Sequence, residues 1–166
     1  PRVAIYSSGP EIAPQGQALK PGQIYDINSY TLATVIEANG GVAVVIGIVE
    51  DTVESIKESL GSASEHDLWV VSGGSSVGTK DLFSEVMEEM GTISFHGVKT
   101  KPGKPTLFGE VDGTPMFGMP GYPTSCLNNS YVYLMPALRK MARLAPKHWV
   151  KVKLPMGHEM VSKSDR

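Results

Sequence analysis

A glycine-rich segment is the first place in this sequence where a ligand could bind through the backbone. It reads Gly73-Gly74-Ser75-Ser76-Val77-Gly78 and lies between an apolar run and a helix-like pattern. Glycine lets backbone N–H groups approach an anion closely, and the amino end of a helix favours negative charge. The segment matches neither the Walker loop nor the dinucleotide-binding fingerprint. It therefore indicates either an anion-binding loop or a flexible connection with Asp81 as a helix N-cap.

The same segment formally matches the G-x-S-x-G motif that presents a nucleophilic serine in hydrolases. In that motif the strand, the serine and the helix follow one another directly, whereas the helix predicted here starts near Asp81, too far past Ser76. Such a hydrolase also needs a histidine late in the chain, and His148 and His158 lie in a tail. We therefore do not predict a serine hydrolase.

Positive charge is concentrated in residues 96–105, which read HGVKTKPGKP. No Asp or Glu occurs between Glu89 and Glu110, so these lysines have no acidic partner nearby in the sequence. Two prolines and a glycine restrict the backbone around Lys101 and Lys104. A rigid lysine pair suits a phosphate or another oxyanion, although a solvated basic loop would have the same composition.

Three carboxylates are candidates for holding a divalent cation beside a phosphate. Glu11, Asp51 and Asp81 each follow one of the first three apolar runs. Carboxylate oxygens are hard ligands that suit Mg²⁺. Helix capping is a strong alternative for Asp51 and Asp81, which precede helix-like patterns, whereas Glu11 has no obvious capping role.

The other reactive residue types indicate structural roles. The histidines at 66, 96, 148 and 158 lack metal-ligand spacing. Cys126 is the only cysteine, which excludes a disulfide within the chain, and we predict that it packs inside a helix. Asp26 and Asn28 are predicted to cap a helix.

Length and composition are those of one soluble globular domain. The chain has 166 residues, of which 41% are hydrophobic and 19% charged. The formal net charge of -2 does not indicate binding to nucleic acid or an anionic membrane. No apolar run is long enough to span a bilayer and no signal peptide is visible, so we expect a cytoplasmic protein.

Both ends of the sequence look cut. Pro1 leads directly into a strand-like run, and residues 150–154 (VKVKL) alternate like the start of another strand. We therefore expect residues 1–148 to form the domain and 149–166 to be the truncated start of a following C-terminal domain.

The apolar patterns predict an α/β fold. Buried strands are expected at 3–7, 42–49 and 68–71, followed by helices at about 28–39, 52–60 and 81–90. Repeated strand–helix units predict a parallel sheet with helices on both faces. Strands at 106–111 and 115–119 flank Asp112-Gly113-Thr114, which predicts a hairpin at one edge. A last helix is expected at about 124–144, with a kink at Pro136.

Such a fold would bring the candidate residues together. In an open α/β sheet, ligands bind outside the carboxyl ends of the strands. The three carboxylates and the glycine-rich segment each follow a strand end, and Pro120-Gly121-Tyr122-Pro123 follows the hairpin. The sequence therefore predicts one ligand site along one rim of the sheet.

Taken in order, several motifs resemble those of a single family, the molybdopterin molybdenumtransferases, which include bacterial MoeA and the E domain of gephyrin. The resemblance extends over about residues 3–143, and its lysine–proline–glycine segment separates this family from the adenylyltransferases that share its fold. The motifs are Pro21-Gly22-Gln23-Ile24-Tyr25-Asp26, Gly47-Ile48-Val49 with Asp51, Ser72-Gly73-Gly74-Ser75-Ser76-Val77-Gly78 with Asp81, Phe95-His96-Gly97-Val98 leading to Lys101-Pro102-Gly103-Lys104-Pro105, Gly118-Met119-Pro120-Gly121-Tyr122-Pro123, and Pro136-Ala137-Leu138-Arg139-Lys140.

The resemblance implies a three-layer α/β/α molybdopterin-binding domain of the MogA-like type, within a larger homo-oligomeric enzyme whose other domains and second subunit complete the active site. The implied reaction inserts molybdate, or tungstate in a related enzyme, into adenylylated molybdopterin with Mg²⁺ and releases AMP. Catalytic roles carry over to Glu11, Asp51, Asp81 and Lys101, with Asp51 and Asp81 as metal ligands. The ligand-binding positions are Gly73, Gly74, Ser75, Ser76, Gly78, Lys104, Pro120, Gly121 and Pro123.

Three positions depart from the family pattern. Pro10 stands where the family usually has an acid, Tyr122 where it has Asn, and Gly97 where some members carry a basic residue. Two alternatives therefore stay open: an adenylyltransferase acting on molybdopterin, and a non-catalytic molybdopterin-binding domain. The lysine motif argues against the first, and the acid missing at Pro10 favours the second.

Overall fold

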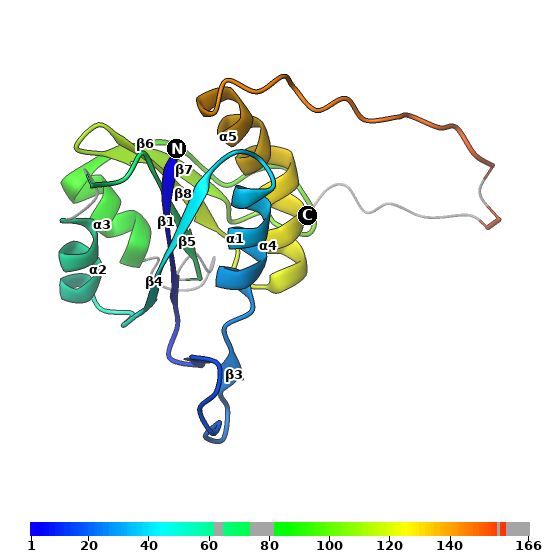
Figure 1. Ribbon diagram of the computed structural model, residues 1–166. Coiled ribbons are helices and arrows are strands. Elements are labelled where there is room, and N and C mark those ends of the chain that lie inside the picture. The colour runs from blue at the N-terminus through cyan, green and yellow to red at the C-terminus, as the bar shows by residue number, and fades with distance from the viewer. Residues whose placement is uncertain (62–64, 74–81, 156, 159–166) are drawn as a thin grey trace.

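A six-stranded sheet forms the centre of the molecule. The computed structural model describes residues 1–61, 65–73, 82–155 and 157–158 (Figure 1). The strand order is β4-β1-β5-β8-β7-β6, and β7 alone runs against its two neighbours. This confirms the predicted α/β fold with a mostly parallel sheet and a hairpin at one edge. The strands are β1 (Arg2–Ser8), β4 (Val42–Val49), β5 (Leu68–Ser72), β6 (Gly91–His96), β7 (Leu107–Val111) and β8 (Thr114–Met119).

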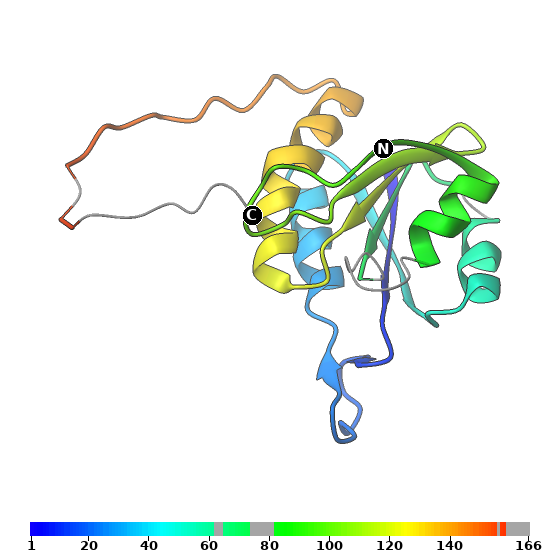
Figure 2. The ribbon, with the colours of Figure 1, turned by 180° about the vertical axis from the view of Figure 1, so that it is seen from behind.

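Helices cover both faces of this sheet (Figures 1 and 2). On one face lie α1 (Asn28–Glu37), α4 (Pro123–Asn129) and α5 (Met135–Met141), and on the other lie α2 (Val53–Leu60) and α3 (Leu82–Met90). Side chains of β1 alternate between the two layers: Ile5 packs in the core beneath α1, whereas Tyr6 packs in the core beneath α2 and α3. The core therefore has two halves, as in a three-layer α/β/α fold.

The helix boundaries follow from side-chain capping and from proline. Thr52 caps α2 by accepting the N–H of Ser55, and Asp26 accepts the N–H of Ser29 in the first turn of α1. A π-helical turn, η2 (Ser130–Leu134), joins α4 to α5. Because Pro136 has no N–H and its ring would clash with the preceding turn of a regular helix, the kink predicted at this proline takes the form of that wider turn.

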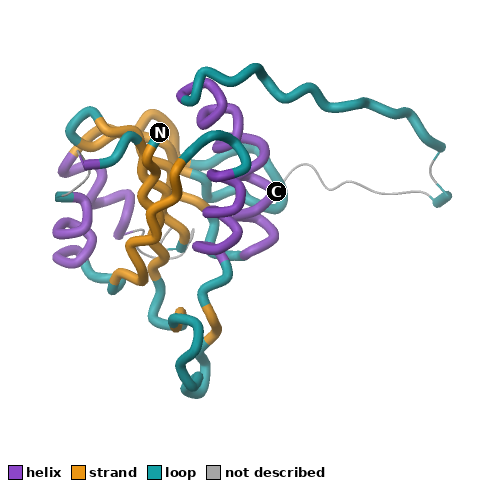
Figure 3. The backbone as a smooth tube through the Cα atoms, in the orientation of Figure 1, coloured by secondary structure: helices purple, strands orange, loops and turns teal. Residues whose placement is uncertain are grey.

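Several local predictions were wrong. Helix α1 ends at Glu37 rather than Asn39, and α5 ends at Met141 rather than Leu144. Strand β6 was not predicted, because most of its residues are exposed and it lacks a continuous apolar run. The long connection between β1 and α1, which we call the chain excursion (residues 9–27), contains a further small pair of strands, β2 (Ile12–Ala13) and β3 (Ile24–Tyr25) (Figure 3).

The strand predicted at residues 150–154 is also wrong. These residues are exposed and pair with no strand in the described part of the chain, so their backbone has no ladder to join. Figure 3 shows this segment as an extended loop.

Strand β4 was predicted to be buried, but it lies at the edge of the sheet. Val42, Val45 and Ile46 are about half exposed. The register with β1 shifts between Ile5 and Tyr6, which face Val45 and Gly47, so Ile46 is an extra residue in β4. This is a β-bulge, a common feature of sheet edges.

We expect Tyr6→Phe to leave the free energy of unfolding unchanged or to raise it by up to about 1 kcal/mol, because the lost hydroxyl satisfies no buried group. The Tyr6 hydroxyl is buried without a hydrogen-bond partner among the described residues, and burial raises its pKa well above the usual value. Urea denaturation measures the change. Tyr133→Phe is the control, because its hydroxyl lies 2.8 Å from Thr100 Oγ1 and its loss should be destabilising. A clear loss of stability in Tyr6→Phe would mean that the hydroxyl has a partner.

Candidate functional site

The carboxyl ends of the adjacent strands β1, β5 and β8 lie close together and form one rim of the sheet. A Cβ atom added at Gly73 would overlap the carbonyl oxygen of Ser8, and one added at Gly121 would lie 3.4 Å from Gly73 Cα. Gly73 also has a positive φ of +90°, and its N–H donates to the carbonyl of Met119 at 3.3 Å. Only glycine allows this approach, so the backbone after β5 closely contacts the ends of both neighbouring strands.

A small pocket of about 40 Å³ opens at this meeting point, with room for a few water molecules or a small group rather than for a whole nucleotide. A large ligand would therefore lie over the rim and place only part of itself inside. The lining residues are Ser7, Ser8, Glu11, Ile12, Ile24, Tyr25, Asp26, Ile27, Asn28, Ser72, Gly73, Gly121 and Pro123. Of the predicted site residues, Glu11, Gly73, Gly121 and Pro123 line the pocket, whereas Pro120 is buried and does not.

A buried carboxylate connects the elements around this pocket. Asp26 accepts hydrogen bonds from Ser7 Oγ at 2.9 Å, Ser29 Oγ at 2.6 Å and the N–H of Ser29 at 3.1 Å. Ser7 Oγ lies 3.0 Å from Ser72 Oγ, so the network joins β1, β5 and α1. The sequence predicted Asp26 only as a cap. The available signal was a serine at the end of the first and third apolar runs, Ser7 and Ser72, but their partners depend on the register of the sheet.

Asn28 links the first turn of α1 to the loop after β8. Its Nδ2 donates to the carbonyl oxygen of Gly121 at 2.8 Å, and its Oδ1 is buried without a partner among the described residues. This contact holds the Gly121 backbone against the pocket. The sequence predicted Asn28 as a cap and did not indicate this role.

Two predicted carboxylates lie beside the end of β1. The Asp51 carboxylate accepts from Ser8 Oγ at 3.4 Å, and the Glu11 carboxylate is adjacent to Gly9, where an added Cβ would lie 2.8 Å from Oε2. Both side chains are exposed. The other predicted residues of this group, Asp81 and the glycine-rich residues Gly74, Ser75, Ser76 and Gly78, lie outside the described residues. Within the described ranges, no cluster of three His, Cys, Asp or Glu side chains could hold a metal ion.

The loop that contains Lys101 and Lys104 follows β6, which runs parallel to β8. It therefore leaves the sheet on the side where the carboxyl ends of β1, β5 and β8 lie. Helix α4 and η2 hold this loop. Asn129 Nδ2 donates to the Gly103 carbonyl at 2.7 Å and to Thr106 Oγ1 at 2.6 Å, and Thr100 contacts Tyr133. Both lysines are exposed, neither lines the small pocket, and neither forms an ion pair with another described residue.

Cys126 is not a candidate nucleophile. Its side chain is fully buried in α4, as predicted. Burial, with a smaller effect from the charge of Asp26, raises the pKa of the Cys126 thiol to about 12. The thiol is therefore protonated at neutral pH, whereas a nucleophilic cysteine needs its thiolate.

The site therefore combines a tight backbone rim, two exposed carboxylates at β1 and a lysine loop at the same edge. The lysine loop can attract an anionic ligand to this rim, because its cations favour negative charge. Each helix within the described ranges is too short or too polar to span a bilayer.

Comparison with known proteins agrees with this architecture. Residues 4–140 match the family described as "Probable molybdopterin binding domain". The molybdopterin molybdenumtransferase of Nostoc is 36% identical over an alignment of 157 positions that covers 92% of this chain and 36% of that protein. Gephyrin of Dictyostelium discoideum is 30% identical, with 89% of this chain and 25% of that protein aligned.

Solved structures show the same relation. The molybdopterin biosynthesis MoeA protein from Pyrococcus horikosii has a TM-score of 0.78 and 44% identity, with 86% of this chain and 36% of that chain covered. The MoaB protein of Thermus thermophilus, at 17% identity and a TM-score of 0.61, shares the fold. The chain spans about a third of the length of the molybdenumtransferases it matches. On this match over most of its length, the chain belongs to the molybdopterin-binding domain family.

Proposed function

We propose that this chain is the molybdopterin-binding domain of a molybdopterin molybdenumtransferase and acts in the biosynthesis of the molybdenum cofactor. The observation that carries the proposal is the family match over residues 4–140, which includes the close-packed rim formed by Ser8, Gly73 and Gly121. The 36% identity to the Nostoc molybdenumtransferase supports the transfer reaction.

In the proposed reaction, adenylylated molybdopterin lies over the rim, and only a small group enters the pocket. Lys101 and Lys104 attract molybdate, or tungstate, through charges that no described acidic residue neutralises. Their loop is braced by Asn129, so the two cations are held at a defined place on the sheet edge. A homo-oligomer of the longer protein is part of the same proposal.

The carboxylates at the end of β1 fit a Mg²⁺ ion chemically. Asp51 beside Ser8 and Glu11 beside Gly9 present exposed, hard oxygen atoms, and Asp81 would add another. Mg²⁺, when bound, would neutralise charge on the phosphoanhydride of the substrate and favour release of AMP. Asp51 and Asp81 would be its ligands, and Glu11 would complete the acidic side of the site.

Isothermal titration calorimetry of adenylylated molybdopterin with Mg²⁺ tests the proposal. We expect saturable binding to this chain, and at least tenfold weaker binding, about 1.4 kcal/mol, in Lys101→Ala. Lys20→Ala removes an equal charge from an exposed position in the chain excursion and should bind within twofold of the original chain.

Each outcome has a defined meaning. A blank titration with the original chain would overturn the proposed binding function, and equal affinity in Lys101→Ala would remove that lysine from the site. In the longer protein, adding molybdate to the bound substrate should release AMP. Binding without this release would support the non-catalytic alternative, and adenylylation of molybdopterin from ATP would support the adenylyltransferase.

A further inference from the structure

Among the described residues, no cationic side chain lines the small pocket at the rim. Its lining includes two carboxylates, Glu11 and Asp26, but no described Lys, Arg or His. Asp26 is buried before the first turn of α1, where it accepts the N–H of Ser29. This carboxylate therefore already occupies the place at which the amino end of the helix would favour an anion. A phosphate or molybdate oxygen in the pocket would meet a charge of its own sign.

The serine hydroxyl groups of the pocket donate to one another and to carboxylates. Ser7 Oγ donates its single proton to Asp26 Oδ1 at 2.9 Å. Ser72 Oγ, which lies 3.0 Å from Ser7 Oγ, is then the donor of that pair, because Ser7 has no proton left. Ser8 Oγ donates to Asp51 Oδ1 at 3.4 Å. These three hydroxyl groups can therefore offer a ligand only oxygen lone pairs.

Two further side chains among the described lining residues carry donors. The hydroxyl group of Tyr25 donates to the carbonyl of Gln17 at 2.9 Å. One hydrogen of Asn28 Nδ2 goes to the carbonyl of Gly121 at 2.8 Å, which leaves only the second hydrogen of that amide. The described side chains of the pocket are thus rich in acceptors and poor in free donors. A polar group that enters has to bring its own hydrogen atoms.

One acceptor of the pocket lining has no partner among the described residues. Asn28 is 6% exposed, and its Oδ1 is buried without a hydrogen bond. The orientation of the amide is fixed, because a carbonyl only accepts: Nδ2 faces Gly121, and Oδ1 faces away from it. A buried acceptor without a partner costs free energy, and a donor on a bound ligand would recover that cost.

The mouth of the pocket is apolar. Ile24, Tyr25 and Ile27 line it and are exposed. They belong to the end of the chain excursion, which projects beyond the sheet (Figure 1). The pocket volume of about 40 Å³ has room for a small group such as an amino group, but not for the ring that carries it. An apolar mouth above an acceptor-rich interior therefore suits a flat heterocycle whose amino group points inward.

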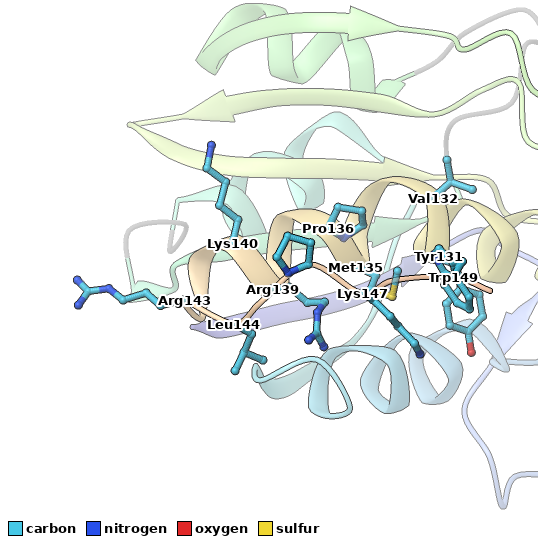
Figure 4. A pocket seen from close by; sticks show the side chains of 11 residues that line it. Tyr131, Val132, Met135, Pro136, Arg139, Lys140, Arg143, Leu144, Lys147 and Trp149 are labelled. Atoms are coloured by element: carbon cyan, nitrogen blue, oxygen red, sulfur yellow. The ribbon is translucent and has the colours of Figure 1, made fainter. Parts of the chain in front are cut away.

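The cations near the C-terminus line a different hollow. It extends along α5 and residues 143–149 and has a volume of about 820 Å³ (Figure 4). No Asp or Glu is among its described lining residues, whose cations are Arg139, Lys140, Arg143 and Lys147. Lys101 and Lys104 also lie outside the small pocket. In the described part of the chain, the side chains that attract anions and the acceptor-rich pocket are therefore separate.

We propose that the small pocket receives the amino group of the ligand's heterocyclic ring, with Asn28 Oδ1 as the hydrogen-bond acceptor. The anionic part of the ligand then lies outside the pocket, toward Lys101 and Lys104. This orientation rests on the proposed function, because it concerns the same substrate. Adenylylated molybdopterin has two rings with an exocyclic amino group, the pterin and the adenine, and the pocket recognises the chemistry that they share.

Two matched pairs of probes test this orientation in the original chain. Inosine monophosphate has an oxo group in place of the amino group of AMP, and lumazine differs from pterin in the same way. NMR titration of the isotope-labelled chain measures weak affinities and shows whether the side-chain amide signals of Asn28 move. We expect the amino compound of one pair to bind about tenfold tighter or more, because an oxo oxygen would face an unpaired acceptor. The pair that shows this preference identifies the ring.

Asn28→Ala tests whether this residue provides the preference. Without the acceptor, the amino and oxo compounds should bind within about twofold of each other. Asn39→Ala is the matched control, because Asn39 is 4% exposed just after the other end of α1 and its Nδ2 also donates to a backbone carbonyl, that of Val35 at 2.7 Å. This control should be destabilised as well but should keep the preference. A merely structural role of Asn28 would weaken both compounds equally and leave their ratio unchanged.

The probe pairs in the original chain decide the question even if Asn28→Ala does not fold. Equal affinity within both pairs, or no binding of either amino compound, would overturn the orientation. So would inorganic phosphate that displaces the bound amino compound and is itself weakened by Asn28→Ala but not by Lys101→Ala, since an oxyanion would then occupy the pocket. Saturable binding of adenylylated molybdopterin without a preference in either pair would leave the proposed function standing, whereas no binding of any of these ligands would reject both.

Discussion

Replacing Gly73 with alanine is expected to lower the free energy of unfolding by about 3 kcal/mol or more. The positive φ of +90° alone costs an alanine about 1–3 kcal/mol. The added Cβ also overlaps the carbonyl oxygen of Ser8. The Ser8 carbonyl belongs to the end of β1, and Gly73 directly follows the parallel neighbour β5, so the clash cannot be relieved without separating the strand ends. The same substitution should abolish ligand binding, since it widens the rim where the ligand would lie.

Urea denaturation with Gly113→Ala as the matched control separates the two causes. Gly113 also has a positive φ, +76°, but no heavy atom lies within 4 Å of an added Cβ. Its replacement should cost about 1 kcal/mol, from backbone conformation alone. The excess loss in Gly73→Ala then measures the contact with Ser8. If the two variants lose the same stability, the strands do not approach as closely as described.

Replacing Asp26 with alanine is expected to destabilise the protein by about 3 kcal/mol, because a buried acceptor is removed and its donors remain. The side chain is only 6% exposed and accepts three hydrogen bonds, from Ser7 Oγ, Ser29 Oγ and the Ser29 N–H. Asp26→Asn should lie between the original chain and the alanine variant, since it keeps one oxygen acceptor but places an N–H₂ group against serine donors.

The comparison for this prediction is Asp67→Ala. Asp67 is exposed and, within the described residues, accepts one hydrogen bond, from the N–H of Arg2 at 2.6 Å. Its loss should cost about 0.5–1.5 kcal/mol, as expected for one hydrogen bond. Equal losses at the two positions, measured by urea denaturation, would show that the buried network contributes nothing beyond one surface contact.

The central strands could be predicted because burial on both faces requires continuous apolar runs. Strand β5 is the clear case, since all its residues are buried and the sequence reads LWVVS. Strand β6 could not be predicted in this way, because its exposed face interrupts the pattern. The opposite error occurred at β4, where an equally apolar sequence lies at an edge. Composition indicates that a segment is a strand, but the order of strands decides how much of it is covered.

In the candidate site, only the residues that follow the end of a strand could be predicted from the sequence. Glu11, Gly73 and Gly121 follow strand ends, and the parallel topology brings them to one pocket. In the Asp26 network, Ser7 lies 19 positions from Asp26 and 65 positions from Ser72 in the chain, so its partners depend on sheet register. The support of the lysine loop by Asn129 likewise depends on where α4 packs, which local sequence does not reveal.

The bulge in β4 has a consequence for self-association. An uncharged edge strand of eight residues, VAVVIGIV, is the kind of segment that templates fibril growth, because its outer N–H and C=O groups can pair with another chain. Here the extra residue Ile46 divides the edge into two short stretches with different registers, residues 42–45 and 47–49. A strand from another chain can pair in register with only one stretch at a time. Each stretch offers few backbone hydrogen bonds, so such pairing is expected to be weak. We therefore expect the bulge to disfavour pairing of this apolar edge with a strand of another chain.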